Sequence, residues 1–290
     1  MKNIVFAITR YKYDSYIDYL ALIQVSGFPT CFVDEIDFNS DNIYIISPIN
    51  GEFRPHIDNQ KSKYKKRCKI IWWNLERPIE VDPSVLEKTT GVYASDFSQV
   101  DFLDKYLDQV WLSDRNFATR IKNVGFDKVQ FVPMGSDAGL MYSKEIAMYT
   151  NYDLIHLSYL TPRRESIIRQ LKDKYTIADN SFITESRNYR LKRTKAMLNI
   201  HQTDHKLIEP LRLALASAYS MPYFSEESID NFPYKPNYDM MQFPYSTLVE
   251  GVKAGLADQR KLNQLGLNLY RTGCEEFRFK NNILQACEGV

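Results

Sequence analysis

KAMLNIHQTDHKLIEPLRLALASAYSMPYFSE, the stretch from Lys195 to Glu226, has the pattern of a strand, a loop, a helix and a second strand. The first strand is the apolar run Ala196–Ile200, and the chain turns apolar again at Met221–Phe224. Between these runs, apolar residues recur at helical spacing: Leu207, Leu211, Leu215 and Ala218. We therefore predict a β-α-β unit, whose two strands are parallel.

The segment between the first strand and the helix, residues 199–205, is polar. Open α/β sheets bind ligands at the carboxyl ends of their strands, so we expect Asn199 and His201 to contact a ligand there. His201 is also a candidate catalytic residue. The alternative for His201 is a structural role, which is common for a single His beside a buried strand.

Two further pairs belong to the same expected sheet edge. Glu209 and Arg212 are three residues apart at the start of the helix and so share one face. Glu209 could bind sugar or ribose hydroxyls and is a second catalytic candidate, while Arg212 could reach a phosphate; the alternative is an ordinary surface ion pair. Ser225 and Glu226 end the next strand and could add hydroxyl-binding groups.

A second informative stretch, LSYLTPRRESIIRQL, covers Leu157–Leu171. Thr161 is a good N-cap, and Pro162 suits the first helical position, so we predict that a helix begins there. The free N–H groups of that helix, together with Arg163 and Arg164, form a site suited to phosphate or diphosphate. The alternative is a capped surface helix with exposed arginines.

The rest of the chain alternates strands and helices on both sides of an irregular segment, Pro133–Thr150. Such a series implies parallel sheets covered on both faces. We predict an N-terminal domain over residues 1–140, a C-terminal domain over 150–256, and a helical tail over 257–290 that could cross back to the first domain.

In the predicted first domain, WWNLERP places Glu76 at the end of a strand. Glu76 is a candidate general base, or it pairs with Arg77 and caps the sheet. Just before this strand lies a basic run with the members Lys61, Lys63, Lys65, Lys66, Arg67 and Lys69. The run is either a solvated loop or a surface for an anionic acceptor such as nucleic acid.

Composition excludes several classes of protein. The 290 residues are 44% hydrophobic and 13% aromatic, which excludes a disordered chain. No apolar run is long enough to span a bilayer and no signal peptide is evident, so we expect a cytoplasmic protein. The four cysteines lie far apart, without the spacing of a zinc site, and GxGxxG and GxxxxGK[ST] are absent. We therefore expect no metal and no bound cofactor.

Taken together, these segments resemble GT-B-fold glycosyltransferases, in particular soluble enzymes related to glycosyltransferase family 4 and to the spore-maturation type. The resemblance rests on four segments in order: LTPRR at 160–164, KAMLNIH at 195–201, IEPLRLALASAYSMPYFSE at 208–226 and YSTLVEGV at 245–252. It implies an α/β protein with two Rossmann-like domains whose parallel sheets face a central cleft. It also implies a nucleoside-diphosphate sugar bound by the second domain, with its phosphates near the first helix.

The chain departs from the family pattern at one position. Family 4 enzymes carry a second Glu further along the Glu209 helix, where this chain has Ser217 or Leu215. The ribose-binding carboxylate is therefore absent or relocated to Glu226. We expect a glycosyltransferase that uses a nucleotide-sugar donor; the alternative is an inactive nucleotide-sugar-binding or scaffold protein with the same fold.

Overall fold

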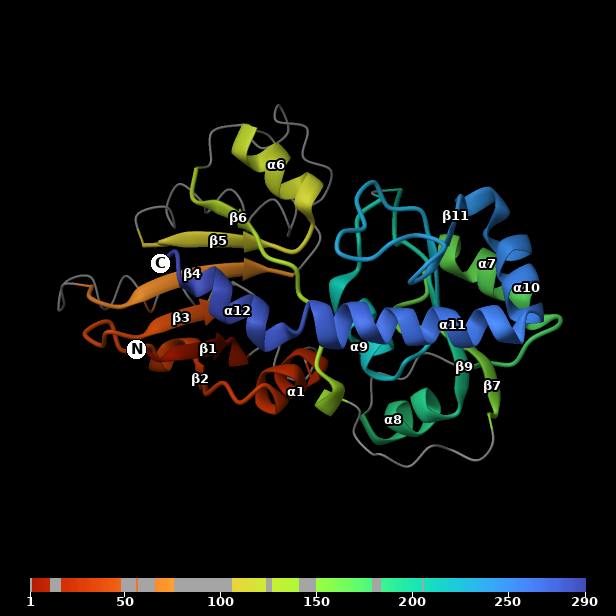
Figure 1. Cartoon of the computed structure of the whole chain (residues 1–290), viewed down its shortest axis with the longest axis horizontal. Coiled ribbons are helices and arrows are strands. Elements are labelled where there is room, and N and C mark those ends of the chain that lie inside the picture. The colour runs from red at the N-terminus through yellow and green to blue at the C-terminus, as the bar shows by residue number, and fades with distance from the viewer. Residues whose placement is uncertain are drawn as a thin grey trace. The chain divides into compact units, whose positions relative to one another are not determined.

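The computed structural model describes residues 2–10, 17–47, 56, 66–75, 106–123, 127–140, 150–178, 184–204 and 206–290 (Figure 1). The chain divides into two compact units. Unit 1 consists of Met1–Pro133 together with Asn282–Val290, and unit 2 consists of Met134–Asn281. The last helix, α12 (Phe279–Cys287), therefore begins in unit 2 and continues in unit 1.

Unit 1 is built around a parallel sheet that has six strands among the described residues. Its elements are β1 (Ile4–Ile8), α1 (Ile17–Val25), β2 (Thr30–Phe32), β3 (Ile43–Ile46), β4 (Lys69–Asn74), β5 (Gln109–Leu112), α6 (Arg115–Asn123) and β6 (Val129–Phe131). The strands lie in the order β2-β1-β3-β4-β5-β6, and every pair is parallel.

Large aromatic side chains fill the core of unit 1. Trp72, Trp73 and Trp111 are buried, and the rings of Trp73 and Trp111 meet edge to face with their centroids 5.6 Å apart. The indole N–H of Trp73 donates to Ser113 Oγ at 2.9 Å, so this buried donor is satisfied. The apolar runs of the central strands are thus buried on both faces, as in other parallel sheets.

Unit 2 repeats the architecture with a parallel sheet of five strands among the described residues. Its strands and main helices are β7 (Tyr152–Ile155), α7 (Pro162–Lys172), β8 (Ile177–Ala178), α8 (Thr184–Lys192), β9 (Thr194–Asn199), α9 (Pro210–Ala218), β10 (Tyr223–Glu226), β11 (Met241–Phe243), α10 (Leu248–Ala257) and α11 (Gln259–Tyr270). A π-helical segment, Arg271–Glu276, connects α11 towards α12.

The strand order of unit 2, β11-β10-β9-β7-β8, matches that of unit 1. In each sheet the first strand lies between the second and the third. The chain therefore leaves the first strand of unit 2, β7, towards one edge and later returns on its other side as β9. This reversal between β7 and β9 is a topological switch point, where open α/β sheets bind ligands.

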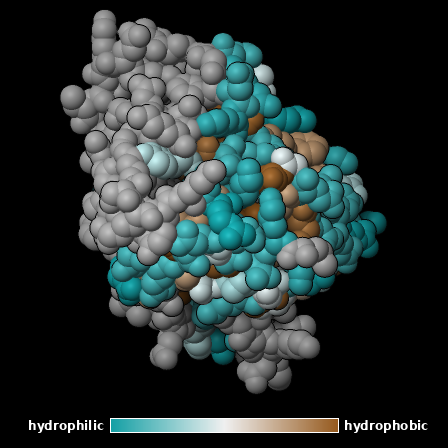
Figure 2. Space-filling model, turned by 90° about the vertical axis from the view of Figure 1, so that its left-hand side faces the viewer, coloured by the Kyte–Doolittle hydropathy of each residue, from teal (hydrophilic) through white to brown (hydrophobic). Residues whose placement is uncertain are grey.

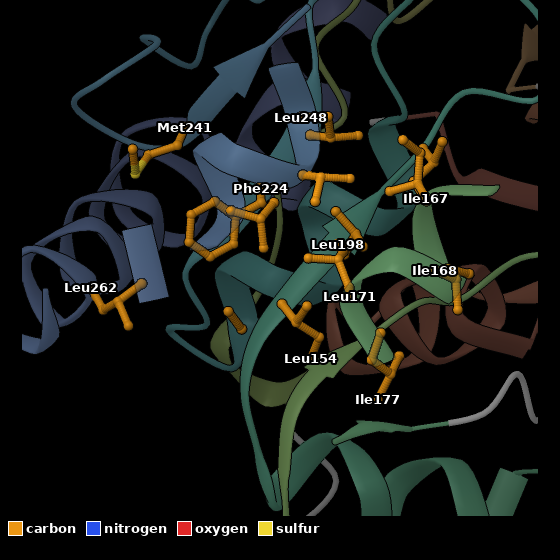
Figure 3. Packing of buried hydrophobic residues seen from close by; sticks show 14 of the residues in the cluster. Leu154, Ile167, Ile168, Leu171, Ile177, Leu198, Phe224, Met241, Leu248 and Leu262 are labelled. Carbon is orange, nitrogen blue, oxygen red and sulfur yellow. The ribbon is translucent and has the colours of Figure 1, made fainter. Parts of the chain in front are cut away.

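The core of unit 2 lies between one face of its sheet and three helices (Figure 3). Leu154, Leu198 and Phe224 project from neighbouring strands into this cluster. Side chains of α7, α10 and α11 meet them, including Leu171 and Leu262. This packing fixes α7 against the sheet, and with it the position of its N-terminus.

The two Rossmann-like α/β units confirm the predicted fold class, with one local correction. The helix expected from Leu207 onward begins at Pro210, and Glu209 is its N-cap residue. Leu207 and Ile208 are buried in the preceding loop, which explains their apolar character without a helix. On the face shown in Figure 2, the coloured residues are mostly hydrophilic, with hydrophobic residues scattered between them.

Candidate functional site

Polar side chains gather at the carboxyl ends of β7, β9 and β10 in unit 2, around the switch point. Asn199 is the last residue of β9, and His201 follows two residues later. Ser225 and Glu226 end β10, which pairs with β9 so that Asn199 lies opposite Ser225. All four side chains are buried. The structure thus brings these predicted residues to one sheet edge.

Helix α7 begins beside this edge. Thr161 is its N-cap, and the Thr161 hydroxyl accepts the backbone N–H of Arg164 at 3.4 Å, as the sequence predicts. Pro162 occupies the first helical position. The positive end of the helix therefore points to the end of the strands, where an anion would be stabilised.

Arg164 is 2% exposed, and its guanidinium is held by backbone carbonyls. Its Nε donates to the carbonyl of Ile200 at 2.9 Å, and its Nη1 donates to that of Tyr159 at 2.9 Å. Among the described residues, Arg164 Nη2 has no hydrogen-bond partner. Burial, followed by the positive charge of Arg212, lowers the pKa of Arg164 to about 10.

Arg212 is the second cation held inside the cluster. Its Nε donates to the carbonyl of Leu157 at 3.1 Å, and its Nη1 donates to the side-chain oxygen of Asn199. The Asn199 amide in turn donates to Ser225 Oγ at 3.0 Å. Glu209 Oε1 lies 3.4 Å from Arg212 Nη1, so these two residues form the predicted pair at the start of α9.

Arg163, by contrast, is bound to a carboxylate of the protein itself. Its Nη1 and Nη2 donate to the two oxygens of Glu226 at 2.5 and 2.6 Å. The pKa of Arg163 is raised chiefly by this hydrogen bond. Glu226 also accepts the backbone N–H of His201 at 2.7 Å.

Two members of the cluster, His156 and Ser158, follow β7 and were not among the predicted site residues. His156 is 1% exposed; its Nδ1 lies 3.0 Å from the carbonyl of Leu198, and its Nε2 lies 2.7 Å from Ser158 Oγ. Burial, then the charge of Arg212, lowers the pKa of His156 to about 3, so the ring is neutral. The available signal was their position directly after an apolar run, as for His201.

The positive charges of the cluster are not all paired in the same way. Arg163 contacts Glu226 and Arg212 lies close to Glu209, while Asp204 adds negative charge near Arg163 and His156 is neutral. Among the described residues, the Arg164 guanidinium is hydrogen-bonded to backbone carbonyls and to no carboxylate. An anion that reaches the N-terminus of α7 therefore meets the positive end of the helix dipole and the Arg164 guanidinium.

Other predicted residues lie elsewhere. Glu76, together with Lys61, Lys63 and Lys65, falls outside the described residues. The described members of the basic run are paired: Lys66 and Lys69 contact Asp108 at 2.5 and 3.2 Å, and Arg67 contacts Asp41 at 2.8 Å. Within the described part of the chain, no helix is long and apolar enough to cross a bilayer, and no three potential metal ligands lie together.

No protein-family model and no curated protein matches this chain. Solved structures do match over its whole length at low identity. HepE of Anabaena in complex with UDP-glucose has a TM-score of 0.65 at 8% identity, with 100% of both chains covered. WaaG, a glycosyltransferase involved in lipopolysaccharide biosynthesis, has a TM-score of 0.60 at 8% identity and covers 99% of this chain and 100% of its own.

A UDP-N-acetylglucosamine 2-epimerase is also similar, with a TM-score of 0.54 at 8% identity over 100% of this chain and 97% of its own. The fold is therefore shared by more than one kind of enzyme. The strand order, the two Rossmann-like units and these likenesses show that the chain has the GT-B fold.

Proposed function

We propose that this protein is a glycosyltransferase that takes its sugar from a nucleoside-diphosphate sugar. The observation that carries the proposal is the cluster of buried guanidinium groups at the switch point of unit 2, built on Arg164, Arg212 and the N-terminus of α7. The likeness to HepE, which was solved with UDP-glucose, supports the same class of donor.

Arg164 and the first N–H groups of α7 bind the diphosphate in this proposal. When the bond between the anomeric carbon and the phosphate oxygen breaks, its electron pair leaves with the diphosphate. The developing negative charge is then stabilised by a buried guanidinium and a helix dipole that are already in place. Arg212 adds positive charge from the adjacent helix.

The donor's hydroxyl groups need acceptors for their protons. Asn199 is hydrogen-bonded to Ser225 and Arg212, and Glu209 lies 3.4 Å from Arg212; Glu209, Asn199 and Ser225 are the groups that we assign to this task. His201, which follows β9, and Glu209 are the candidate catalytic residues of this unit. The acceptor is a separate question, with a modified nucleobase in DNA or a surface glycan as candidates.

The proposed reaction uses no metal ion, because cationic side chains stabilise the leaving group. Transfer or donor hydrolysis should therefore continue after dialysis against EDTA. A loss of activity in EDTA that is restored by added Mg²⁺ or Mn²⁺ would refute this part of the proposal.

Calorimetry with UDP and GDP tests the proposed site. Losing a hydrogen bond to a charged group costs about 1.5–3 kcal/mol, so Arg164→Gln should weaken binding by about ten- to a hundredfold. Arg169→Gln is a matched control, because Arg169 is exposed on the same helix. Equal affinity of the Arg164 variant and the wild type would remove Arg164 from the site.

The rival proposal, a binding protein without turnover, is favoured by the missing second Glu of family 4 enzymes, at whose position this chain has Ser217 or Leu215. It predicts tight nucleotide-sugar binding with no release of nucleoside diphosphate. Slow release of nucleoside diphosphate in the absence of acceptor would favour the glycosyltransferase over the binding protein.

A further inference from the structure

The contact between Arg163 and Glu226 has the geometry of a fixed structural pair. Two parallel N–H···O bonds of 2.5 and 2.6 Å join the guanidinium to the carboxylate. The side chain of Glu226 is 5% exposed and that of Arg163 is 23% exposed. Bidentate pairs of this kind are strong and fix orientation, and breaking a buried pair leaves an uncompensated charge.

The same pair binds both backbone groups of His201. Glu226 Oε2 accepts the His201 N–H at 2.7 Å, while Arg163 Nη1 donates to the His201 carbonyl at 3.2 Å. His201 itself is 1% exposed. The peptide groups on each side of the His201 Cα are therefore held by side chains from α7 and β10, which fixes the direction in which the His201 side chain leaves the backbone.

Tyr245 holds Arg163 from a third direction. The guanidinium carbon of Arg163 lies 3.9 Å from the centre of the Tyr245 ring, and the Tyr245 hydroxyl donates to the Arg163 carbonyl at 2.8 Å. Tyr245 begins the single turn that precedes α10. Side chain and backbone of Arg163 are thus both fixed by one aromatic residue.

We infer that Arg163, Glu226 and Tyr245 are positioning residues that act through His201 and do not contact the donor. The inference rests on the proposed function, and it changes the role expected for Arg163. Its charge is matched by Glu226, so it offers a phosphate less attraction than Arg164 does. Glu226, in turn, already accepts three donors and has little capacity left for a sugar hydroxyl.

A different account uses the same contact: Glu226 could stand in for a phosphate and leave Arg163 when the donor arrives. That account predicts that Glu226→Gln raises nucleotide affinity, because it frees a cation. Fixed positioning predicts no such gain. The third contact, from Tyr245, and the bond to the His201 N–H favour fixed positioning.

Amide NMR of histidine-labelled protein tests the geometry directly. The chain has four histidines, so ¹⁵N-histidine labelling gives a spectrum that single His replacements can assign. Glu226→Gln, Arg163→Lys and Tyr245→Phe should each move the His201 amide resonance. Glu250→Gln, which breaks the exposed pair with Lys253 in the same unit, is the matched control and should leave it in place.

Kinetics separates positioning from contact. We expect the three variants to lower kcat for donor hydrolysis by about tenfold, because the rate falls steeply when a catalytic group such as His201 is displaced. The Kd for nucleoside diphosphate should stay within about twofold, the range of a substitution outside the binding site. Tyr245→Phe removes one hydroxyl only and keeps the test available if a charge variant fails to fold.

Three results would overturn the inference: a His201 amide that does not move in the variants, a Kd for Arg163→Lys about tenfold weaker with unchanged kcat, or a tighter Kd in Glu226→Gln. Failure of the proposed function looks different. The wild type itself would neither bind nor release nucleoside diphosphate, and the NMR result would still decide whether the three residues fix His201.

Discussion

At the scale of single residues, His156 shows how the cluster controls protonation. The carbonyl of Leu198 can only accept, so His156 carries its proton on Nδ1 and its Nε2 accepts from the Ser158 hydroxyl. A second proton on this ring would break the bond from Ser158 and place a cation beside Arg212 and Arg164. His156 therefore supports the site as a neutral, oriented group.

This neutral histidine makes stability depend on pH. The pKa of His156 falls from 6.5 to about 3 on folding, so between these values the unfolded chain binds a proton that the folded chain does not. The free energy of unfolding should rise with pH across this window, by up to about 1.4 kcal/mol per unit, and level off above pH 6.5. His156→Asn retains a donor for the Leu198 carbonyl but loses this dependence.

Urea unfolding at pH 4.5 and 7 measures the effect. The wild type should gain about 2–3 kcal/mol more than His156→Asn between the two values. The same gain in both proteins would show that His156 does not titrate as its burial requires.

At the scale of elements, the packing of α11 depends on a glycine, Gly266, which has no side chain at a crowded position. A Cβ on Gly266 would lie 2.1 Å from the backbone oxygen of Ser220 and 3.3 Å from Pro222 Cδ. Ser220 connects α9 to β10, so Gly266 lets α11 approach this connection closely.

Gly266→Ala should therefore destabilise the protein, although alanine is the better helix former by about 1 kcal/mol. We expect a net loss of about 1–3 kcal/mol, seen as a lower Tm in scanning calorimetry, because a backbone oxygen must move. Gly289→Ala is the control, since the nearest atom to its Cβ is 4.0 Å away. A Tm for Gly266→Ala at or above that of the control would contradict this packing.

Signals from adjacent residues predicted the helices and strands better than they predicted which residues contact each other. Thr161 and Pro162 correctly predicted the start of α7, because capping is a property of adjacent residues. Helical spacing placed the start of α9 too early, since buried loop residues such as Leu207 are apolar for the same reason as helix residues. Pro210 was the better signal.

Contacts between residues far apart in the chain could not be predicted from the sequence. Arg163 and Glu226 are separated by 63 residues, and nothing in either neighbourhood indicates that they meet. Two charged residues at the same sheet edge are equally suited to a ligand or to each other. Only the register of β9 and β10 and the placement of α7 decide between these roles.

At the scale of the whole molecule, the small net charge and the pairing of the described residues of the basic run leave few of their positive charges to bind a polyanionic acceptor such as nucleic acid. The net charge is +1, and the described residues of the basic run, Lys66, Arg67 and Lys69, are paired with carboxylates. Binding to a nucleic acid through this run would therefore depend on Lys61, Lys63 and Lys65, which lie outside the described residues.

If duplex DNA binds through this run, three lysines give a slope of log K against log salt no steeper than about −2.7, at about 0.9 per phosphate contact. Fluorescence anisotropy at several salt concentrations measures the slope, with a variant carrying Ser at all three lysines as the comparison. A steeper slope, or binding that the triple replacement leaves unchanged, would place the contact elsewhere.

Both units share one strand order, yet the cluster described here belongs to the second alone. We propose that this cluster supports sugar transfer from a nucleotide donor. The most direct measurement is the release of nucleoside diphosphate from UDP-, GDP-, ADP- and TDP-sugars by the purified chain without acceptor. We expect slow release from at least one donor, reduced at least about tenfold in Arg164→Gln and unchanged in Arg169→Gln. Tight binding without release, or release that Arg164→Gln leaves intact, would contradict it.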